Sequence, residues 1–202
     1  MENRRITQFT DKYTESGLIG GFLVRNFFIK IKSVSPKDSD SVLEVGCGAG
    51  YSLLDLQKFF PKNTSFGACD IDPELVRLAK EKNPNVKCGV CSIYDLPYED
   101  KSFDTVICLE VLEHLEDPEK ALSELARVSR KHVIISTPNE PIWRILNCFR
   151  GKYLKSFGNT PGHINHWSSR KLKDLVSKYF EVTEVKQPLP WTIVYGKNKN
   201  LR

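Results

Sequence analysis

The alternation of short apolar runs with segments of helical spacing is the feature that most restricts the fold of this chain. The runs that predict strands are 41–45, 64–69, 86–91, 103–109 and 132–136. Between them, residues 51–60, 73–82 and 118–130 place apolar residues on one helical face. This order predicts a parallel sheet whose strands are joined by crossover helices.

The end of the chain has a different pattern. Two further helices are predicted at 141–150 and 169–179, followed by strands at 181–185 and 191–195. The two strands are so close in sequence that we expect them to pair antiparallel at a sheet edge. Residues 1–33 are expected to form one or two helices that cover the sheet. A chain of 202 residues fits a single domain, 1–202.

The first predicted strand ends in a glycine-rich loop, VLEVGCGAG at 42–50. In an open parallel sheet, ligands bind beyond the carboxyl ends of the strands, and glycines allow a close approach to the backbone. A dinucleotide fingerprint would need glycine at position 51, where the chain has Tyr51. Asp70 ends the second strand, where a carboxylate can accept hydrogen bonds from both ribose hydroxyls. The pattern predicts a site for a nucleoside without a 2′-phosphate.

Three motifs in order, VLEVGCGAG, GACDID and DLPYEDKSFDTVICLEVLEHLEDPEKALSELARV, carry a family resemblance. From about residue 10 to residue 185 the chain resembles the class I S-adenosylmethionine-dependent methyltransferases of the type-11 group. The resemblance implies an α/β, Rossmann-like fold: a seven-stranded, mostly parallel sheet with an antiparallel edge strand and helices on both faces. It also implies S-adenosylmethionine as cofactor.

The resemblance assigns cofactor contacts to the first two motifs. Gly46, Cys47 and Gly48 should line the methionine part of the cofactor, and Glu44 should orient its amino group through water. Asp70 should hold the ribose hydroxyls.

Further cofactor contacts are expected outside the glycine loop. Ile71 should lie against the adenine, Leu109 should flank the methionine end, and Tyr13 should close the site from the N-terminal side. Family members often have an aspartate for the adenine amino group after the third strand. Here Ser92 and Ile93 stand at that place, so Ser92 or the backbone would make the contact.

Candidate catalytic residues follow the fourth strand and return later in the chain: Glu110, Glu113, His114, His163 and His166. An oxygen nucleophile must lose its proton, and imidazole is the side chain best suited to accept it near neutral pH. The ExxEH motif also resembles ubiquinone-biosynthesis O-methyltransferases and the enzymes that methylate the 2′-hydroxyl at small-RNA 3′ ends. That likeness implies Mg²⁺ or Mn²⁺ on Glu110, Glu113, His114 and His163, or on His166 in place of His163. If no metal binds, His114, His163 or His166 is the expected general base.

The basic charge is concentrated in the last third of the chain. Residues 141–202 carry twelve Lys and Arg against three Asp and Glu, so the surplus of +9 leaves −4 on residues 1–140. Residues 138–168 lie where the family has substrate-covering insertions, and 141–157 are apolar on one side and basic on the other. This segment predicts peripheral contact with an anionic membrane, or a lid packed on the domain.

We therefore expect a methyltransferase that acts on a small-molecule acceptor at oxygen, with a lipid-like acceptor as one option. An RNA 2′-O-methyltransferase, in which Trp143 or Trp167 stacks a base, ranks lower because no RNA-binding appendage is recognisable. Two hypotheses from different functional classes are a non-catalytic cofactor-binding module and a nucleotide-sugar or NAD-binding Rossmann protein.

Compartment and thiol state follow from composition. The polar N-terminus lacks a secretory signal and no run approaches the ~18 apolar residues of a membrane span, so we expect a cytoplasmic protein. Six cysteines are expected to be reduced. Cys88 and Cys91 are interpreted as small apolar strand residues rather than zinc ligands, because no second ligand pair accompanies them.

Overall fold

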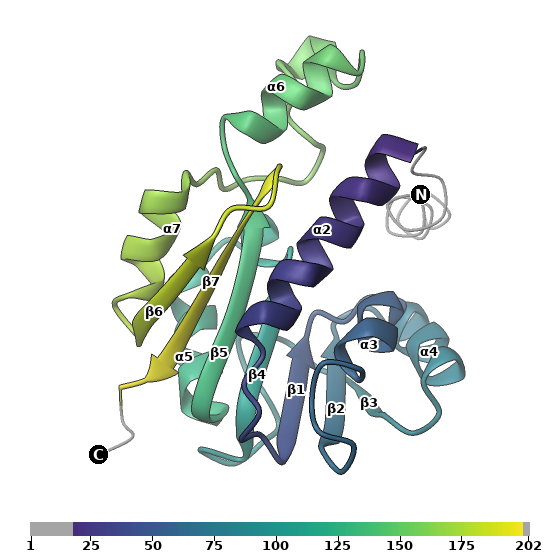
Figure 1. Ribbon diagram of the computed structural model, residues 1–202, viewed down its shortest axis with the longest axis vertical. Helices are drawn as coiled ribbons and strands as arrows, with labels where there is room; N and C mark the ends of the chain where they lie inside the picture. Colours follow the sequence, from purple (N-terminus) through teal and green to yellow (C-terminus); the bar gives the residue numbers. More distant parts are fainter. Residues whose placement is uncertain (1–17, 200–202) are drawn as a thin grey trace.

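The computed structural model describes residues 18–199, and these form a seven-stranded sheet with helices on both faces (Figure 1). The strands are β1 (Ser41–Val45), β2 (Ser65–Asp70), β3 (Lys87–Val90), β4 (Phe103–Leu109), β5 (Ser129–Pro138), β6 (Phe180–Lys186) and β7 (Trp191–Asn198). Their order is β3-β2-β1-β4-β5-β7-β6, and β7 runs antiparallel to both of its neighbours. The predicted fold class and the antiparallel pair at the sheet edge are confirmed.

The helices divide between the two faces of the sheet. They are α2 (Leu18–Val34), α3 (Tyr51–Leu56), α4 (Pro73–Lys82), α5 (Pro118–Val128), α6 (Ile142–Phe149) and α7 (Ser169–Val176), with short 3₁₀ turns η1 (Leu112–His114) and η2 (Leu154–Ser156). Helices α2, α3 and α4 cover one face, while α5 and α7 pack on the other. Helix α6 stands apart from both layers, beyond the end of the sheet (Figure 1).

The central strands are apolar on both sides because both faces of the sheet are covered. In β4, Val106 packs on the α5 side and Ile107 on the α2 side, and both are fully buried. Leu43 and Val42 of β1 divide between the faces in the same way. This burial explains why these strands appear in the sequence as continuous apolar runs.

Most of the predicted element bounds agree with the structure, and the differences have local causes. Helix α4 spans the predicted 73–82 and is capped by Asp72, whose carboxylate accepts from the N–H of Glu74 and of Leu75. Helix α3 ends at Leu56 instead of 60, because the N–H of Phe59 bonds to the carbonyl of Leu56 three residues earlier and tightens the turn.

The expectation that the cysteines are reduced is wrong for one pair, since Cys69 and Cys91 form a disulfide. Cys69 lies near the end of β2 and Cys91 directly follows β3, the neighbouring parallel strand. This pairing brings their Cα atoms to 5.9 Å, within the range that a disulfide spans. Cys88, the other residue of the CxxC pair, remains a free thiol.

Helices long and apolar enough to cross a bilayer are absent from residues 18–199, the part of the chain that the structure describes.

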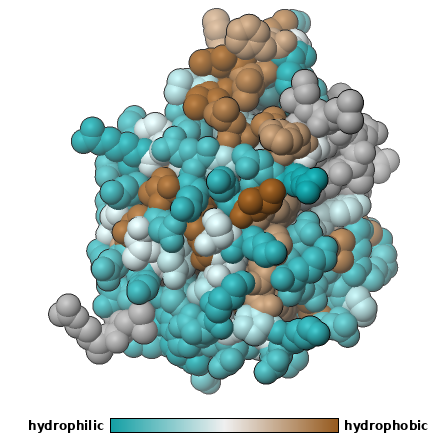
Figure 2. Space-filling model, in the orientation of Figure 1, coloured by the Kyte–Doolittle hydropathy of each residue, from teal (hydrophilic) through white to brown (hydrophobic). Residues whose placement is uncertain are grey.

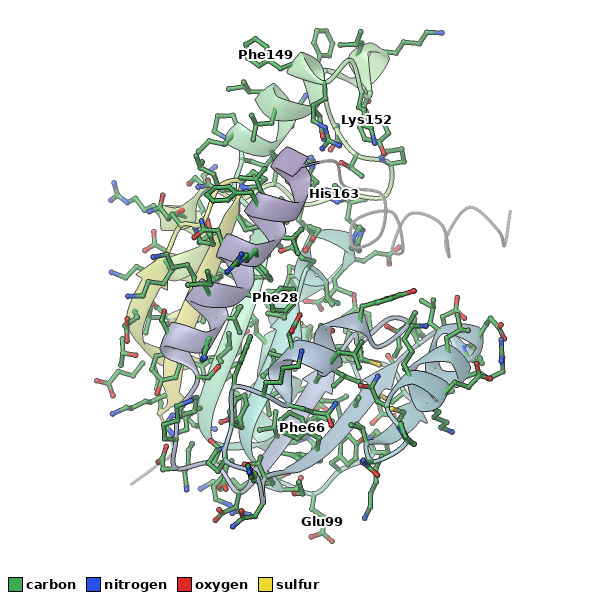
Figure 3. The ribbon with its side chains drawn as sticks, turned by 45° about the vertical axis from the view of Figure 1, so that its right-hand side comes forward. Phe28, Phe66, Glu99, Phe149, Lys152 and His163 are labelled. Atoms are coloured by element: carbon green, nitrogen blue, oxygen red, sulfur yellow. A yellow bond between two sulfur atoms is a disulfide. The ribbon has the colours of Figure 1, made fainter. Side chains whose placement is uncertain are left out.

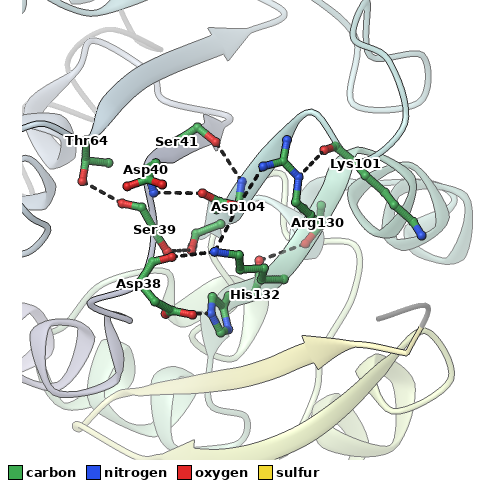
Figure 4. A network of polar contacts seen from close by, with 12 residues as sticks. Asp38, Ser39, Asp40, Ser41, Thr64, Lys101, Asp104, Arg130 and His132 are labelled. Carbon is green, nitrogen blue, oxygen red and sulfur yellow. Dashed lines mark hydrogen bonds and ion pairs between the residues drawn. The ribbon is translucent and has the colours of Figure 1, made fainter. Parts of the chain in front are cut away.

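A polar network joins the chain before β1 to the amino ends of β4 and β5 (Figure 4). The Nε2 atom of His132 lies 3.1 Å from a carboxylate oxygen of Asp38, and its Nδ1 lies 3.0 Å from the hydroxyl of Tyr195. The carboxylate of Asp104 accepts from the N–H of Asp40 at 2.9 Å. Burial lowers the pKa of His132, and this effect outweighs the opposing influence of Asp38. The network therefore holds a mostly neutral imidazole inside the fold.

We predict that this histidine makes the protein less stable as the pH falls. Its pKa is lower in the folded state than the ordinary value of about 6.5, so protonation favours the unfolded chain. The stabilisation is complete above that value and is lost below it. Urea unfolding should show a free energy of unfolding that declines between about pH 7 and about pH 5, and His132→Gln should flatten that decline. Equal slopes for the two proteins would contradict the assignment.

Candidate active site

The site lies where the strand order reverses, at the carboxyl ends of β1 and β4. From β1 the chain continues outward through β2 and β3, whereas β4 and β5 lie on the other side of β1. The connections after β1 and β4 therefore leave in opposite directions and meet at one edge. In doubly wound sheets this edge is the ligand-binding position.

The glycine loop after β1 is a set of left-handed turns packed on the β4 connection. Gly46, Gly48 and Gly50 have φ angles of +79°, +52° and +76°. The N–H of Gly46 and that of Cys47 both donate to the carbonyl of Cys69, at 2.8 and 3.0 Å. A Cβ on Gly46 would lie 2.3 Å from a methyl carbon of Val111. Glycine is therefore required here both by conformation and by space.

Asp70 closes this loop from the end of β2. One of its carboxylate oxygens accepts from the N–H of Gly48 at 2.8 Å, and the other accepts from the N–H of Asp72 at 3.0 Å. Burial raises the pKa of Asp70, against the lowering effect of these two N–H groups. The neighbouring Ile71 is 72% exposed, so an apolar surface stands open beside the carboxylate.

Glu44 is a buried carboxyl group at the same edge. It is 1% exposed, and burial raises its pKa to about 8, assisted by the charge of Asp70 and opposed by a hydrogen bond with Ser52. Among the described residues, its Oε2 atom has no hydrogen-bond partner. A buried carboxyl group with an unused oxygen fits a ligand that carries an ammonium group, as S-adenosylmethionine does.

The remaining expected cofactor contacts occupy less open positions. Leu109 is buried in the core on the α2 side, and Ile93 is buried in the core on the α5 side. Cys47 packs with α3 and α4, and burial raises the pKa of its thiol. The Ser92 hydroxyl accepts from the N–H of Tyr94 at 3.2 Å. Tyr13 lies outside the described residues.

Glu110 follows β4 in a strained conformation. Its φ of +58° lies in the left-handed region, which costs a residue other than glycine about 1 to 2 kcal/mol. Ser136 of β5 holds it there: the Ser136 carbonyl accepts from the N–H of Glu110 at 3.1 Å, and the Ser136 hydroxyl donates to its carboxylate at 2.8 Å. Strain of this kind is concentrated at functional sites.

Three of the predicted metal and catalytic residues come together one turn later. Glu113, His114 and His163 each offer a ligand atom, and these atoms all lie within 4.8 Å of one another. Glu113 and His163 are buried, whereas His114 lies at the exposed rim. The rings of His114 and His163 meet edge to face at 4.9 Å, and the ring of Trp143 stacks on His163 at 6.1 Å.

Backbone hydrogen bonds hold the segment after His163 next to η1, although the two are far apart in sequence. The N–H groups of Ile164 and Asn165 both donate to the carbonyl of Glu113, at 2.9 and 3.1 Å. The Asn165 side chain donates to the carbonyl of Leu115 at 2.6 Å.

The tautomer of His114 follows from a contact with the same loop. Its Nδ1 atom lies 2.9 Å from the Gly162 carbonyl, which can only accept, so Nδ1 is the donor in this contact. Metal-binding histidines typically show this arrangement, with the second ring nitrogen bonded to a carbonyl.

Two candidates lie outside this cluster. The Glu110 carboxylate is held by Ser136, and His166 is exposed, with its Nε2 atom 2.8 Å from the amide oxygen of Asn159. Sequence reasoning missed Ser52 and Ser136, the hydrogen-bond partners of Glu44 and Glu110. Nothing in the sequence marks a serine 26 residues from its glutamate as its partner.

Sequence comparisons show that this chain is similar to known methyltransferases. Residues 43–136 match the family model of the methyltransferase domain. An uncharacterised methyltransferase of Schizosaccharomyces pombe is 38% identical over 104 residues, which are 46% of this chain and 37% of that protein. A ubiquinone biosynthesis O-methyltransferase of Xanthomonas oryzae pv. oryzae is 38% identical over 92 residues, 43% of this chain and 37% of that protein.

A solved structure extends the likeness to the whole fold. Magnesium protoporphyrin IX methyltransferase from Synechocystis PCC 6803, solved with bound S-adenosylhomocysteine, superposes with a TM-score of 0.68 and 17% identity, over 97% of this chain and 92% of that one. The curated relatives are longer, since the match covers little more than a third of each. Within that extent, residues 43–136 match the methyltransferase domain, and the likeness of the rest of the chain is one of fold.

Proposed function

We propose that this protein transfers a methyl group from S-adenosylmethionine to an oxygen atom of a small acceptor, which is lipid-like. The observation that carries the proposal is the cluster of Glu113, His114 and His163 beside the end of β4. When bound, S-adenosylmethionine supplies an electrophilic methyl group, which needs no further activation by the protein. The chain must hold the acceptor hydroxyl in line and accept its proton.

The cluster residues suit these two tasks. His114 lies at the rim of the cluster with its Nδ1 atom bonded to Gly162, so Nε2 is the ring nitrogen that would take up a hydroxyl proton. Glu113 and His163 lie deeper and would orient the hydroxyl. Burial of both side chains excludes water from the reacting oxygen, which favours a transfer in which charge is lost.

The same three residues could hold a divalent cation. One carboxylate and two imidazoles within 4.8 Å of one another suit Mn²⁺ better than Mg²⁺, which prefers oxygen ligands. We propose that such an ion is held by Glu113, His114 and His163, with Glu110 as an outer carboxylate bonded to Ser136. Its chemistry would be to lower the pKa of the acceptor hydroxyl.

Other parts of the chain would complete the site. Residues 138–168, which contain α6 and η2, would cover the acceptor side of a single domain, and residues 1–33 would cover the sheet. Tyr13 would close the cofactor site. His166 would contribute as a general base only in a site without metal.

Product analysis is the direct test of the acceptor class. The protein should be incubated with methyl-labelled S-adenosylmethionine and, separately, an isoprenoid phenol, a short water-soluble phenol and RNA fragments. Label on the phenolic oxygen would support the proposal, whereas label on a ribose 2′-oxygen would replace it with RNA methylation. Cofactor binding without product from any acceptor would indicate a non-catalytic module.

Asp70→Ala should weaken the binding of S-adenosylhomocysteine by roughly tenfold to hundredfold, because charge-assisted hydrogen bonds to the ribose would be lost. Asp55→Ala, which removes an exposed aspartate of α3, should leave the affinity unchanged. Isothermal titration calorimetry measures both. Equal affinities for the two variants would show that the ribose is held elsewhere.

Cofactor binding should release a proton at neutral pH. Glu44 has a pKa of about 8 in the free protein, so it is mostly protonated at about pH 7, and a nearby ammonium group would lower that pKa. Titrations with S-adenosylhomocysteine in two buffers of different ionisation enthalpy should give different apparent heats. Glu44→Gln should abolish the difference. Identical heats for the unmodified protein would exclude this role of Glu44.

His163→Ala should weaken Mn²⁺ binding by at least roughly tenfold, since even the loss of a group that hydrogen-bonds to a metal ligand typically costs that much affinity. His166→Ala is the matched control, because His166 lies outside the cluster, and it should bind Mn²⁺ normally. The electron paramagnetic resonance signal of free Mn²⁺ reports the binding. If the two variants bind Mn²⁺ equally, His163 is not a ligand; full methylation activity in EDTA would remove metal from the proposal.

A further inference from the structure

Residues 141–158 form a lobe, here called the α6 lobe, that projects beyond the carboxyl edge of the sheet (Figure 1). Its inner side is attached to the domain: the Trp143 ring packs on Trp191 at 6.0 Å, and its indole N–H donates to the Thr160 hydroxyl. Trp143 also stacks on His163 of the cluster. The lobe is therefore anchored next to the candidate acceptor site.

The outer side of the α6 lobe exposes large apolar side chains. The exposed fractions are 49% for Ile145, 85% for Phe149, 60% for Leu154 and 79% for Phe157. Figure 2 shows hydrophobic residues gathered at this end of the molecule, and Figure 3 places Phe149 at the far tip. A patch of this kind on a protruding element marks an interaction surface.

These side chains border an apolar groove of about 500 Å³. Its lining residues are Pro141, Arg144, Ile145, Cys148, Phe149 and Phe157. Those from α6 recur at helical spacing and so share one face of the helix. The prediction of a lid packed on the domain is therefore wrong for this face of α6, whose apolar side chains are exposed.

The exposed Phe157 lies in a strained segment of the α6 lobe. Tyr153 and Phe157 have φ angles of +57° and +49°, a region that side chains other than glycine disfavour. The Arg144 side chain donates to the Phe157 carbonyl at 2.9 Å, and the N–H of Gly158 donates to the Tyr153 carbonyl at 2.9 Å. Residues held in this region cluster at active sites and ligand-binding segments, which agrees with a binding role for the lobe.

The charge around the patch has one sign. Arg144, Arg150, Lys152 and Lys155 lie in the α6 lobe, and residues 141–168 contain no Asp or Glu. Arg150, Lys152 and Lys155 are exposed. Exposed apolar and aromatic side chains flanked by Lys and Arg complement an anionic bilayer, whose acyl region takes the apolar residues while its headgroups attract the cations.

We infer that the α6 lobe docks on an anionic phospholipid membrane, with Phe149, Leu154 and Phe157 inserted at the interface. The inference rests on the proposed function in one respect: docking in this orientation turns the carboxyl edge of the sheet toward the bilayer. A membrane-dissolved acceptor would then reach the Glu113, His114 and His163 cluster beside Trp143. The partner is the lipid surface itself, not a protein.

Vesicle sedimentation tests the inference. The full chain is mixed with vesicles of phosphatidylcholine alone or with added phosphatidylglycerol, at low and at high salt. We expect sedimentation with the anionic vesicles that weakens at high salt. The double variant Phe149→Ser/Phe157→Ser should lower the partition coefficient by roughly tenfold for each ring removed. Lys152→Glu should lower it by at least about fivefold.

Matched controls lie elsewhere on the molecule. Ile29 of α2 is 52% exposed, similar to Ile145, and Ile29→Ser should not change sedimentation. Lys62, an exposed lysine before β2, should tolerate Lys62→Glu. Circular dichroism and calorimetry with S-adenosylhomocysteine should show that each variant is folded and binds cofactor.

Two outcomes would overturn the inference: no sedimentation of the unmodified protein with anionic vesicles at low salt, or equal sedimentation of the lobe variants and their controls. Both are separate from failure of the proposed function, which is measured without vesicles on the short water-soluble phenol. If the protein methylates this phenol but does not bind vesicles, the proposed function is supported and the membrane inference is wrong.

Discussion

The close packing between the connections after β1 and β4 is the constraint on which the site depends. Gly46 lies so near Val111 that no Cβ would fit between them without movement. This contact fixes the glycine loop, with Glu44 and Asp70 around it, against the segment that carries Glu110, Glu113 and His114. A cofactor site and an acceptor site are thereby placed at one edge of the sheet, as the parallel strand order requires.

The site and the α6 lobe carry charges of opposite sign. Glu44, Asp70, Glu110 and Glu113 gather at the inner edge, where burial and the charges of Glu113, Glu44 and Glu110 raise the pKa of the Cys108 thiol. The cations of the α6 lobe lie outside. The inner edge thus suits cationic ligands, and the outer lobe suits anionic ones, so one end of the molecule offers two different surfaces.

Periodicity predicted the architecture well because burial on both faces leaves a strong sequence signal. The strands at 41–45 and 103–109 and the helix at 73–82 have the predicted bounds. The other ends shifted where local hydrogen bonds decide, as at Phe59, whose N–H closes a tight turn. The disulfide was missed because Cys69 and Cys91 meet only through strand pairing.

The sequence by itself determined which residues are available: the glycine loop, Asp70, two glutamates and three histidines in recognisable motifs. Only the tertiary structure decided which of them act together. Glu110 and Glu113 are equivalent in the motif. The left-handed backbone at Glu110 allows its carboxylate to bond to Ser136. The side chain of Asn165 bonds to the next turn, and this contact places Glu113 near His163. His163 and His166 are three positions apart in the sequence. The path of the loop places His163 in the cluster and leaves His166 at the surface. Contacts between distant segments are set by packing, which no local pattern encodes.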